Sequence, residues 1–215
     1  FPVTLELALF AIVPVIGVGV AMGTTAALNR DKFFDQFTRV VSIIGWSLPT
    51  FVLGIWLLVI FYGALGWFQP GRVSTAYAIE MAGAASQFEN YTRMLTIDAL
   101  LNGRFDIFLN ALRHMVLPVI TLAVVLSAQI MRVMRSSLLD ALGQDYVRTA
   151  RAKGLSNGAV MQRHVLRNSL IPVVTFRGGD LGALMGGAII TEGLFNISGV
   201  GGTLWQAIIK EEPTT

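Results

Sequence analysis

Residues 140–172 read DALGQDYVRTARAKGLSNGAVMQRHVLRNSLIP, a polar and strongly basic block between two apolar stretches of membrane-spanning length. The apolar stretches predict membrane helices, because about 20 helical residues cross the hydrocarbon core of a bilayer. A basic block held between two such helices lies outside the membrane, where another protein can reach it. The block therefore predicts a membrane fold with a docking surface.

The composition of the chain indicates an integral membrane protein. Of its 215 residues, 54% are hydrophobic and only 13% are charged, and the mean hydropathy is +0.65. A soluble core of this size does not require so much apolar material. The basic residues lie beside apolar stretches without interleaved aromatic residues, so the net charge of +3 does not predict nucleic-acid binding. The absence of cysteine from the sequence excludes disulfide scaffolds and thiolate zinc sites.

Apolar stretches predict an all-α, polytopic transmembrane bundle. The clearest predicted span is 40–68, which contains no charged residue, and the others are 5–28, 117–131 and 170–190. The stretch 117–131 is short and can borrow residues from the amphipathic piece before it. Prolines lie within or at the ends of these stretches, where they predict kinks or entry points: Pro14, Pro49, Pro118 and Pro172.

The distribution of Lys and Arg predicts the orientation. The loops 29–39 and 132–167 are rich in basic residues, which places them in the cytoplasm by the positive-inside rule. The segment 69–115 is then an external loop. Both termini also lie outside, and the chain opens on Phe1 without a signal-peptide pattern. From these features we expect the interior of a longer protein, with at least one further span at each end.

The basic block divides into two short helices at a sharp bend. The apolar residues of the first helix recur every four positions and predict one face: Leu138, Leu142, Tyr146 and Ala150. Gly154 is expected to end this helix, because glycine readily adopts the left-handed conformation after a C-terminus. Ser156 is expected to cap the second helix. A solvated loop whose charge only sets topology is the alternative.

The same block resembles a known family. DYVRTARAKGLS followed by RHVLRNSLIPVVT is similar to the cytoplasmic coupling-loop signature of dipeptide/oligopeptide-type permease subunits of ABC importers. Further stretches agree in order: TLELAL at 4–9, SLPTFVLGIWL at 47–57, RHMVLPVITLA at 113–123 and GGAIITEGLFNISGVG at 186–201. The resemblance covers nearly the whole chain, apart from the first and last transmembrane helices of that family.

One departure from the general pattern of ABC importers narrows the resemblance to one branch of the family. The general coupling-loop pattern of ABC importers is Glu-Ala-Ala, three residues and then Gly, and it falls here on Arg148, Thr149, Ala150 and Gly154. Only Ala150 and Gly154 match that general pattern. The variant Thr-Ala-Arg-Ala-Lys-Gly is instead similar to that of the peptide-type branch.

The resemblance implies a type I ABC importer permease in the cell membrane, carrying dipeptides, oligopeptides or similar small solutes. Its single transmembrane domain would cover 1–215, with a cytoplasmic coupling loop at 138–168. Its partners would be a second permease, two ATP-binding cassette ATPases and an external substrate-binding protein, within a lipid bilayer. The residues assigned to ATPase coupling are Tyr146, Arg148, Thr149, Ala150, Arg151, Lys153, Gly154 and His164.

The chain is not expected to be an enzyme or to carry a cofactor or a metal. It has no G-x-x-x-x-G-K-[ST] phosphate-binding pattern, so ATP hydrolysis must occur on another subunit. His114 and His164 are its only histidines. They are too few and too far apart for a metalloprotease helix or a catalytic triad, and a packing role is the commoner one.

The stretch 170–190 carries the candidates for the translocation pathway. Arg177 and Asp180 are three residues apart and can pair on one helical face. Ionisable groups inside a membrane commonly mark a pathway, although a self-satisfied salt bridge near the cytoplasmic end is equally compatible. Small residues at fourfold spacing allow close helix approach, and packing alone is their simpler explanation: Gly178, Gly182 and Gly186, with a weaker pattern at Gly19 and Gly23.

Two other functions remain compatible with the sequence. An ion-gradient-driven secondary transporter or channel could use Arg177 and Asp180, but it would not need a basic helix pair. A membrane-embedded scaffold would need only the glycine patterns. Dependence on ATPase subunits separates the three. Relatives carry peptides, nickel chelates, glutathione and sugars, so the sequence does not identify the solute or the second permease.

Overall fold

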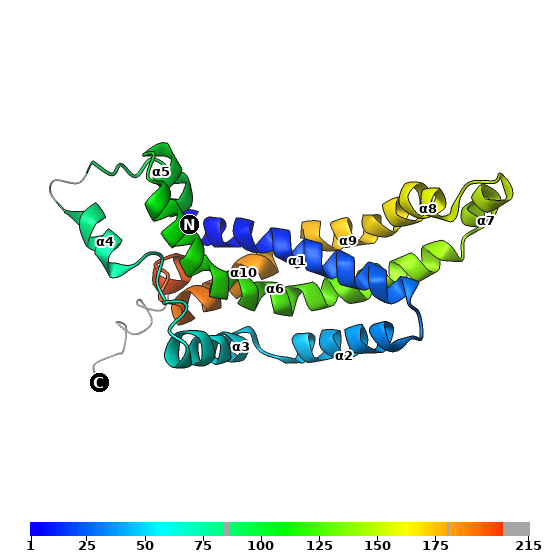
Figure 1. Ribbon diagram of the computed structural model, residues 1–215, viewed down its shortest axis with the longest axis horizontal. Coiled ribbons are helices and arrows are strands. Elements are labelled where there is room, and N and C mark those ends of the chain that lie inside the picture. The colour runs from blue at the N-terminus through cyan, green and yellow to red at the C-terminus, as the bar shows by residue number, and fades with distance from the viewer. Residues whose placement is uncertain (84–86, 180, 204–215) are drawn as a thin grey trace, which may run out of the picture. The chain divides into compact units, whose positions relative to one another are not determined.

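The computed structural model describes residues 1–83, 87–179 and 181–203, with the side chains of 176–185 excluded, and it is helical without strands over this part of the chain (Figure 1). It forms two compact units. Unit 1 contains Phe1–Ile12, Pro49–Leu122 and the described part of Ala183–Thr215, and unit 2 contains Val13–Leu48 and Ala123–Gly182. Helices α1 (Pro2–Leu28) and α6 (Phe105–Leu142) contribute to both.

The remaining helices are short. Unit 1 holds α3 (Thr50–Leu57), a π-helix (Leu58–Ala64), α4 (Thr75–Ala82), α5 (Leu95–Leu101) and most of α10 (Leu181–Leu194). Unit 2 holds α2 (Phe33–Ser47), α7 (Asp145–Ala152), α8 (Asn157–Val160), a second π-helix (Met161–Leu166) and α9 (Arg167–Gly179).

Among the described residues, α1 and α6 are long and apolar enough to cross a membrane, and the α2–α3 pair is a third candidate if it is one broken span. The prediction of 117–131 is confirmed as part of the longer α6. At 1.5 Å per residue, the 38 residues of α6 extend about 57 Å, well beyond the ~30 Å hydrocarbon core. Pro14 and Pro118 lie inside α1 and α6 without ending them.

The clearest predicted span, 40–68, is wrong as one continuous helix. Helix α2 already begins at Phe33 and ends at Ser47, and a new helix starts at Thr50. Leu48 has an extended backbone with φ −81° and ψ 121°. Pro49 explains the break, because its ring disfavours helical geometry in the preceding residue and it has no backbone N–H to donate.

The predicted span 170–190 falls on two helices rather than one. Helix α9 has 13 residues and α10 has 14, each shorter than the ~20 residues that cross a bilayer. Asp180, between them, lies outside the described residues. Pro172 lies inside α9. The fourth span is therefore not among the candidates found in the described part of the chain.

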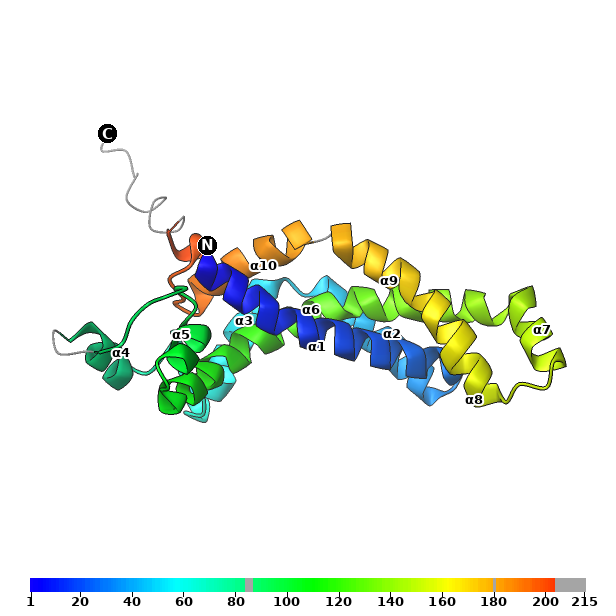
Figure 2. The same cartoon turned by 90° about the horizontal axis from the view of Figure 1, so that it is seen from above.

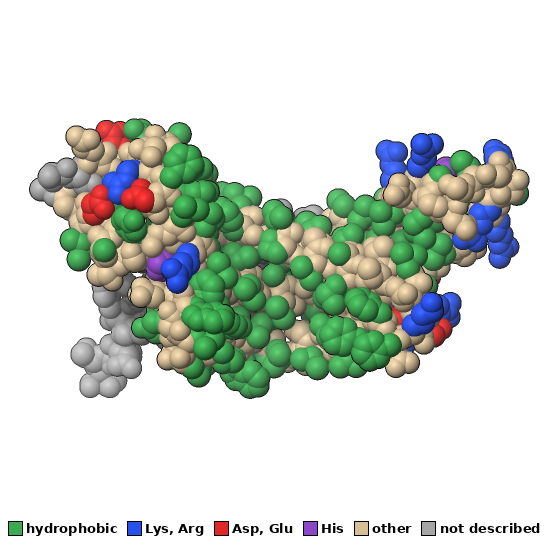
Figure 3. Space-filling view, viewed as in Figure 1, with side chains coloured by type: hydrophobic (Ala, Val, Ile, Leu, Met, Phe, Trp, Pro, Cys, Tyr) green, Lys and Arg blue, Asp and Glu red, His purple; other side chains and the backbone are tan. Residues whose placement is uncertain are grey.

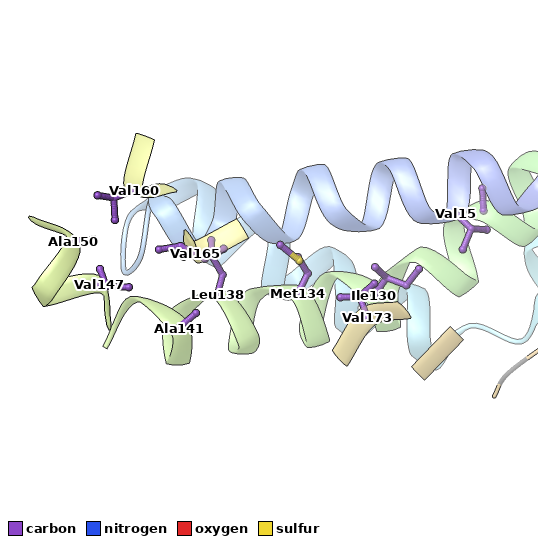
Figure 4. Close-up of a cluster of buried hydrophobic side chains, with 12 residues drawn as sticks. Val15, Ile130, Met134, Leu138, Ala141, Val147, Ala150, Val160, Val165 and Val173 are labelled. Atoms are coloured by element: carbon purple, nitrogen blue, oxygen red, sulfur yellow. The ribbon is translucent and has the colours of Figure 1, made fainter. Parts of the chain in front are cut away.

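The core of unit 2 forms where α1, α6 and α9 pack together (Figures 2 and 4). Its largest fully buried side chains in Figure 4 include Ile130, Met134 and Leu138 of α6. Helix α1 approaches α6 closely at Gly23, where an added Cβ would lie 2.8 Å from the carbonyl oxygen of Met131. The weaker predicted glycine pattern is therefore a close helix contact.

One hydrophobic cluster of unit 1 joins α4, α5 and the start of α6. Leu95, Ala99, Ile107 and Ala111 are buried together, and Tyr77 packs against them. A backbone hydrogen bond from Gly71 N to Phe195 O (2.7 Å) ties the segment before α4 to the end of α10. These contacts hold the described parts of 69–115, which are 69–83 and 87–115, as a folded body rather than an open loop.

Candidate functional sites: the basic helix pair and the charged clusters

Helices α7 and α8 form a bent pair at the end of α6. Helix α7 ends at Ala152, and Gly154 follows with φ +77°, a left-handed backbone that favours glycine. Leu155 N donates to Ala150 O (3.3 Å), which closes the turn. Ser156 Oγ then accepts from Ala159 N (3.4 Å) and caps α8. The predicted order of helix, bend and helix is confirmed.

The inner side of the pair differs from the predicted apolar face. Val147 and Ala150 are buried against Leu138 and its neighbours, whereas Tyr146 is 37% exposed (Figure 4). The cause is the turn at 143–144, which interrupts the helix between α6 and α7. A fourfold repeat cannot continue through a break, so Val147 occupies the position predicted for Tyr146.

The outer side of α7 is polar and basic. Arg148, Thr149, Arg151 and Lys153 are all exposed. Arg148 has only a 3.4 Å contact to the exposed Asp145, and Thr149 Oγ1 donates to Asp145 O (2.9 Å). Figure 3 shows Lys and Arg side chains gathered over this end of unit 2. Within the described part of the chain, these basic residues have no ion pair: Arg151, Lys153, Arg163 and Arg167.

His164 lies on the π-helix that follows α8 and is partly buried. Its neighbour Val165 is fully buried in the core of unit 2, and Ser169 Oγ donates to Val165 O (2.8 Å). Ser137 Oγ of α6 donates to Ser169 O (3.0 Å). The second arm of the pair, which is α8 with the π-helix after it, is therefore fixed to α6, as α7 is.

The predicted pathway residues are only partly described. Arg177 and Gly178 belong to α9 and Gly182 belongs to α10, but their side-chain surroundings and Asp180 lie outside the described residues. At Gly186, an added Cβ would meet nothing described within 4 Å. The Arg177–Asp180 pair and the pathway role of the glycines therefore stay predictions.

Sequence reasoning missed a buried ion cluster in unit 2. Asp35 is fully buried and accepts from Arg135 Nε (2.5 Å), Arg135 Nη2 (2.8 Å) and Arg39 Nη2 (2.7 Å). The backbone N–H of Asp31 donates to the same carboxylate (3.0 Å), with Asp31 at φ +62°. The fourfold spacing of Asp35 and Arg39 was the available signal.

Unit 1 buries its carboxylates differently. Glu6 of α1 is 1% exposed and accepts from Thr96 N (2.7 Å), Thr96 Oγ1 (2.6 Å) and Arg72 Nη2 (2.8 Å). Asp98 accepts from the N–H (2.8 Å) and the hydroxyl (2.7 Å) of Thr92. Both carboxylates tie loop segments to helices. They were overlooked because their partners are distant in sequence or are backbone groups.

Glu192 of α10 is the third buried carboxylate of unit 1. Gly201 N donates to its Oε2 (2.8 Å), and Ile197 N donates to its backbone carbonyl (2.8 Å). A Cβ at Gly199 would overlap the Glu192 carboxylate. The segment after α10 therefore folds back over this side chain, which explains why glycines follow it so closely.

The surface of unit 1 carries charges that pair with one another. Arg104 contacts Asp106 (2.7 Å) and Glu80 (2.7 Å), and these two carboxylates raise the pKa of Arg104. The group borders a hollow of about 490 Å³ beside Ile79 and Asn102.

His114 is buried, with Nδ1 2.8 Å from the Asn110 carbonyl oxygen. Within the described residues, no three His, Asp or Glu side chains are grouped to hold a metal ion.

Comparisons with known proteins agree on one family. The family model described as "Binding-protein-dependent transport system inner membrane component" matches residues 19–213. The di/tripeptide transport system permease protein DppB of Pseudomonas aeruginosa is 42% identical over 213 residues, covering 99% of this chain and 61% of that protein. The dipeptide permease DppB of Haemophilus influenzae is 38% identical, over 97% and 60% respectively.

A third relative is the peptide transport system permease protein SapB of Salmonella typhimurium. It is 34% identical to this chain, over 99% of the chain and 64% of that protein. The chain thus spans less than two thirds of the length of these relatives.

Proposed function

Because the chain belongs to the family of binding-protein-dependent transport system inner membrane components, we propose that it is a permease subunit of an ATP-driven ABC importer. It forms half of the translocation pathway, together with a second permease. Two ATP-binding cassette ATPases supply the energy, and a substrate-binding protein delivers the solute. The chain itself performs no covalent chemistry.

The observation that carries this proposal is the basic helix pair. Its inner side is fixed to α6 through Val147, Ala150 and Val165. Its outer side presents exposed cations, of which only Arg148 has an ion contact, to the exposed Asp145, among the described residues. An element with one buried side and one free polar side transmits force when a partner grips the free side. ATP-driven closure of the ATPases would therefore move α7 and α6 together.

The outer residues of α7 have distinct roles in this proposal. Arg148, Arg151 and Lys153 set the register of docking through charge complementarity. Tyr146 and Thr149 add contact area on the exposed side, and Ala150 holds the helix to its base. Gly154 supplies the bend, and His164 supports the second arm. The segment 138–168 is then the cytoplasmic coupling loop, and 69–115 faces the substrate-binding protein outside.

Peptides are the proposed solutes, because the three permeases compared above are named for peptide, dipeptide or di/tripeptide transport. Arg177 and Asp180, with Gly178, Gly182 and Gly186 on the same stretch, are the proposed pathway residues. An ion-gradient-driven transporter is the other candidate function. It is disfavoured because a binding-protein-dependent system couples uptake to its own ATPase, and because such a transporter has no use for α7.

The test is a charge reversal on α7 in the intact complex, reconstituted in nanodiscs. Arg148→Glu with Arg151→Glu should reduce ATP hydrolysis stimulated by peptide-loaded binding protein at least about ten-fold, since disrupting desolvated charge contacts costs about 2 kcal/mol or more. Arg30→Glu with Lys32→Glu makes the same charge change on another exposed loop and should leave the stimulation within about two-fold.

Two results would count against the proposal. Equal assembly and equal stimulated hydrolysis in the α7 double variant and the wild type would remove the coupling role. Peptide uptake in proteoliposomes that resists vanadate but stops on addition of a protonophore would indicate the ion-gradient alternative.

A further inference from the structure

The face of unit 2 between α2 and α6 carries two adjacent hollows that the transport proposal does not use. The first, of about 260 Å³, is lined by Arg39, Arg132, Arg135 and Ile43 among others. The second lies on the other side of Arg132, beside Trp46. Arg132 is therefore shared by both hollows.

The two hollows together are called the α2–α6 groove. Arg132 is the cation of this groove that has no counter-charge among the described residues. Its guanidinium carbon lies 5.0 Å from the centroid of the Trp46 ring, a cation–π contact. No carboxylate among the described residues pairs with it, whereas Arg39 and Arg135 both bind Asp35. Asp35 and Asp31 thus neutralise Arg39 and Arg135, and Arg132 is left as the guanidinium of this face that can attract an anion.

The depth of the groove follows from the charges along the helices. In α6, no charged residue occurs from Met115 to Met131, and Arg132 is the first after that stretch. These 17 residues extend about 25 Å, close to the thickness of the hydrocarbon core. In α2, Arg39 is the last charged residue before the uncharged stretch. Arg132 and Arg39 therefore lie where hydrocarbon meets headgroups.

Apolar side chains of α2 lie at and beside the two hollows. Val40, Ile43, Ile44 and Trp46 of α2 are about half exposed, at 54%, 59%, 53% and 51%. Thr38, Ser42, Gln129 and Ser136 line the hollows beside the arginines, whereas water would not cover the four apolar side chains favourably. The ligand must supply hydrocarbon for these side chains and an anion for Arg132.

We propose that the α2–α6 groove is a binding site for an anionic phospholipid. The phosphate lies against Arg132, and Arg39 and Arg135 add to the positive field. The acyl chains lie along Ile43 and Trp46. Basic pockets between membrane helices bind anionic headgroups through this combination of charge and interfacial depth. The inference requires only that unit 2 lies in a bilayer and is independent of the transported solute.

The test uses native mass spectrometry of the intact protein in its purified complex, titrated with phosphatidylglycerol and, separately, with phosphatidylcholine. The wild type should bind phosphatidylglycerol more tightly than phosphatidylcholine. Arg132→Gln should weaken phosphatidylglycerol binding about five-fold, because one basic residue near an anionic surface contributes about 1 kcal/mol. Arg132→Lys should retain most of the affinity, because an ammonium group also binds phosphate.

Arg163→Gln is the matched control, since it removes one exposed and unpaired cation from the same unit outside the groove. It should bind phosphatidylglycerol like the wild type. The proposal is overturned if both lipids bind equally, or if Arg163→Gln weakens binding as much as Arg132→Gln. Displacement of the lipid by millimolar inorganic phosphate would instead indicate a site for free anions, and displacement by dipeptide would place the groove in the pathway.

Discussion

Unit 2 and unit 1 both bury carboxylates, but they surround them with different donors. In unit 2, Asp35 is held by two arginines, and Arg132, Arg151 and Lys153 remain without ion pairs within the described residues. In unit 1, Glu6 and Asp98 are held mainly by threonine hydroxyls and backbone amides.

This difference distinguishes charges that stabilise the fold through ion pairs from charges that remain available to bind partners. Arg72 and Arg104 of unit 1 each bind carboxylates of the same unit, whereas Arg93 and Arg113 have no ion pair among the described residues. Unit 2 has more cations than its own carboxylates can neutralise. Such a surplus is unfavourable by self-repulsion unless an anionic partner covers it. The surplus is therefore where we place the ATPase contact and the lipid.

Asp35→Asn tests the arginine-held carboxylate and has the largest expected effect. It leaves Arg135 without a counter-charge and Arg39 with only its 3.4 Å contact to the exposed Asp31, and removal of one partner of a buried pair costs about 3 kcal/mol of unfolding free energy. Equilibrium unfolding of the intact protein in mixed micelles measures this loss. Asp31→Asn is the control, because the backbone N–H of Asp31 holds Asp35, while its exposed side chain makes only long contacts to Arg39 (3.4 Å) and Arg30 (3.3 Å). Equal losses for both variants would contradict the assignment.

Glu6→Gln tests the corresponding site of unit 1 and should cost about 2 kcal/mol. The amide keeps one oxygen for Thr96, but its NH₂ group cannot accept from Arg72. The smaller loss follows because most donors at Glu6 are neutral. The same unfolding measurement on Glu80→Gln, a half-exposed partner of Arg104, should show a loss below about 1 kcal/mol. A Glu6 loss larger than that of Asp35→Asn would reverse the comparison.

The sequence predicted local features well where a single residue determines the geometry. Gly154 and Ser156 placed the bend and the cap of the helix pair, and the apolar stretches placed α1 and α6. Periodicity failed at the turn 143–144, because a repeat counted along the chain does not register a break in the helix. Hydropathy did not predict the helix break at Pro49, because an apolar stretch does not register a break in the helix either.

The buried clusters were beyond sequence reasoning for a different cause. Arg135 and Asp35 are 100 residues apart, and Thr96 and Glu6 are 90 residues apart. Nothing local indicates that these groups meet. The charge of Arg135 was assigned to topology alone, although its guanidinium is committed to Asp35. The coupling role that the pattern predicts for Arg148, Arg151 and Lys153 stays a prediction.

Gly23→Ala tests whether helix packing in unit 2 depends on the glycine pattern of α1. A new Cβ would lie 2.8 Å from Met131 O and 2.8 Å from Met134 Cβ, so α1 must shift. Overpacking of this kind costs about 1.5 kcal/mol. Gly17→Ala, six residues earlier on the same helix, meets nothing within 4 Å and should be neutral or slightly stabilising. Equal unfolding free energies for the two variants would show that the contact is looser.

Gly154→Ala has the smallest expected effect, and it concerns backbone geometry alone. No atom lies within 4 Å of an added Cβ, so the cost is that of holding alanine at φ +77°, about 1 kcal/mol. Hydrogen exchange at residues 145–160 should therefore accelerate about five-fold, without a change elsewhere. Gly158→Ala is the matched control, because Gly158 is equally open but helical. Gly154→Asn should restore slow exchange, since asparagine tolerates the left-handed region; failure of that rescue would mean that the bend depends on something other than φ.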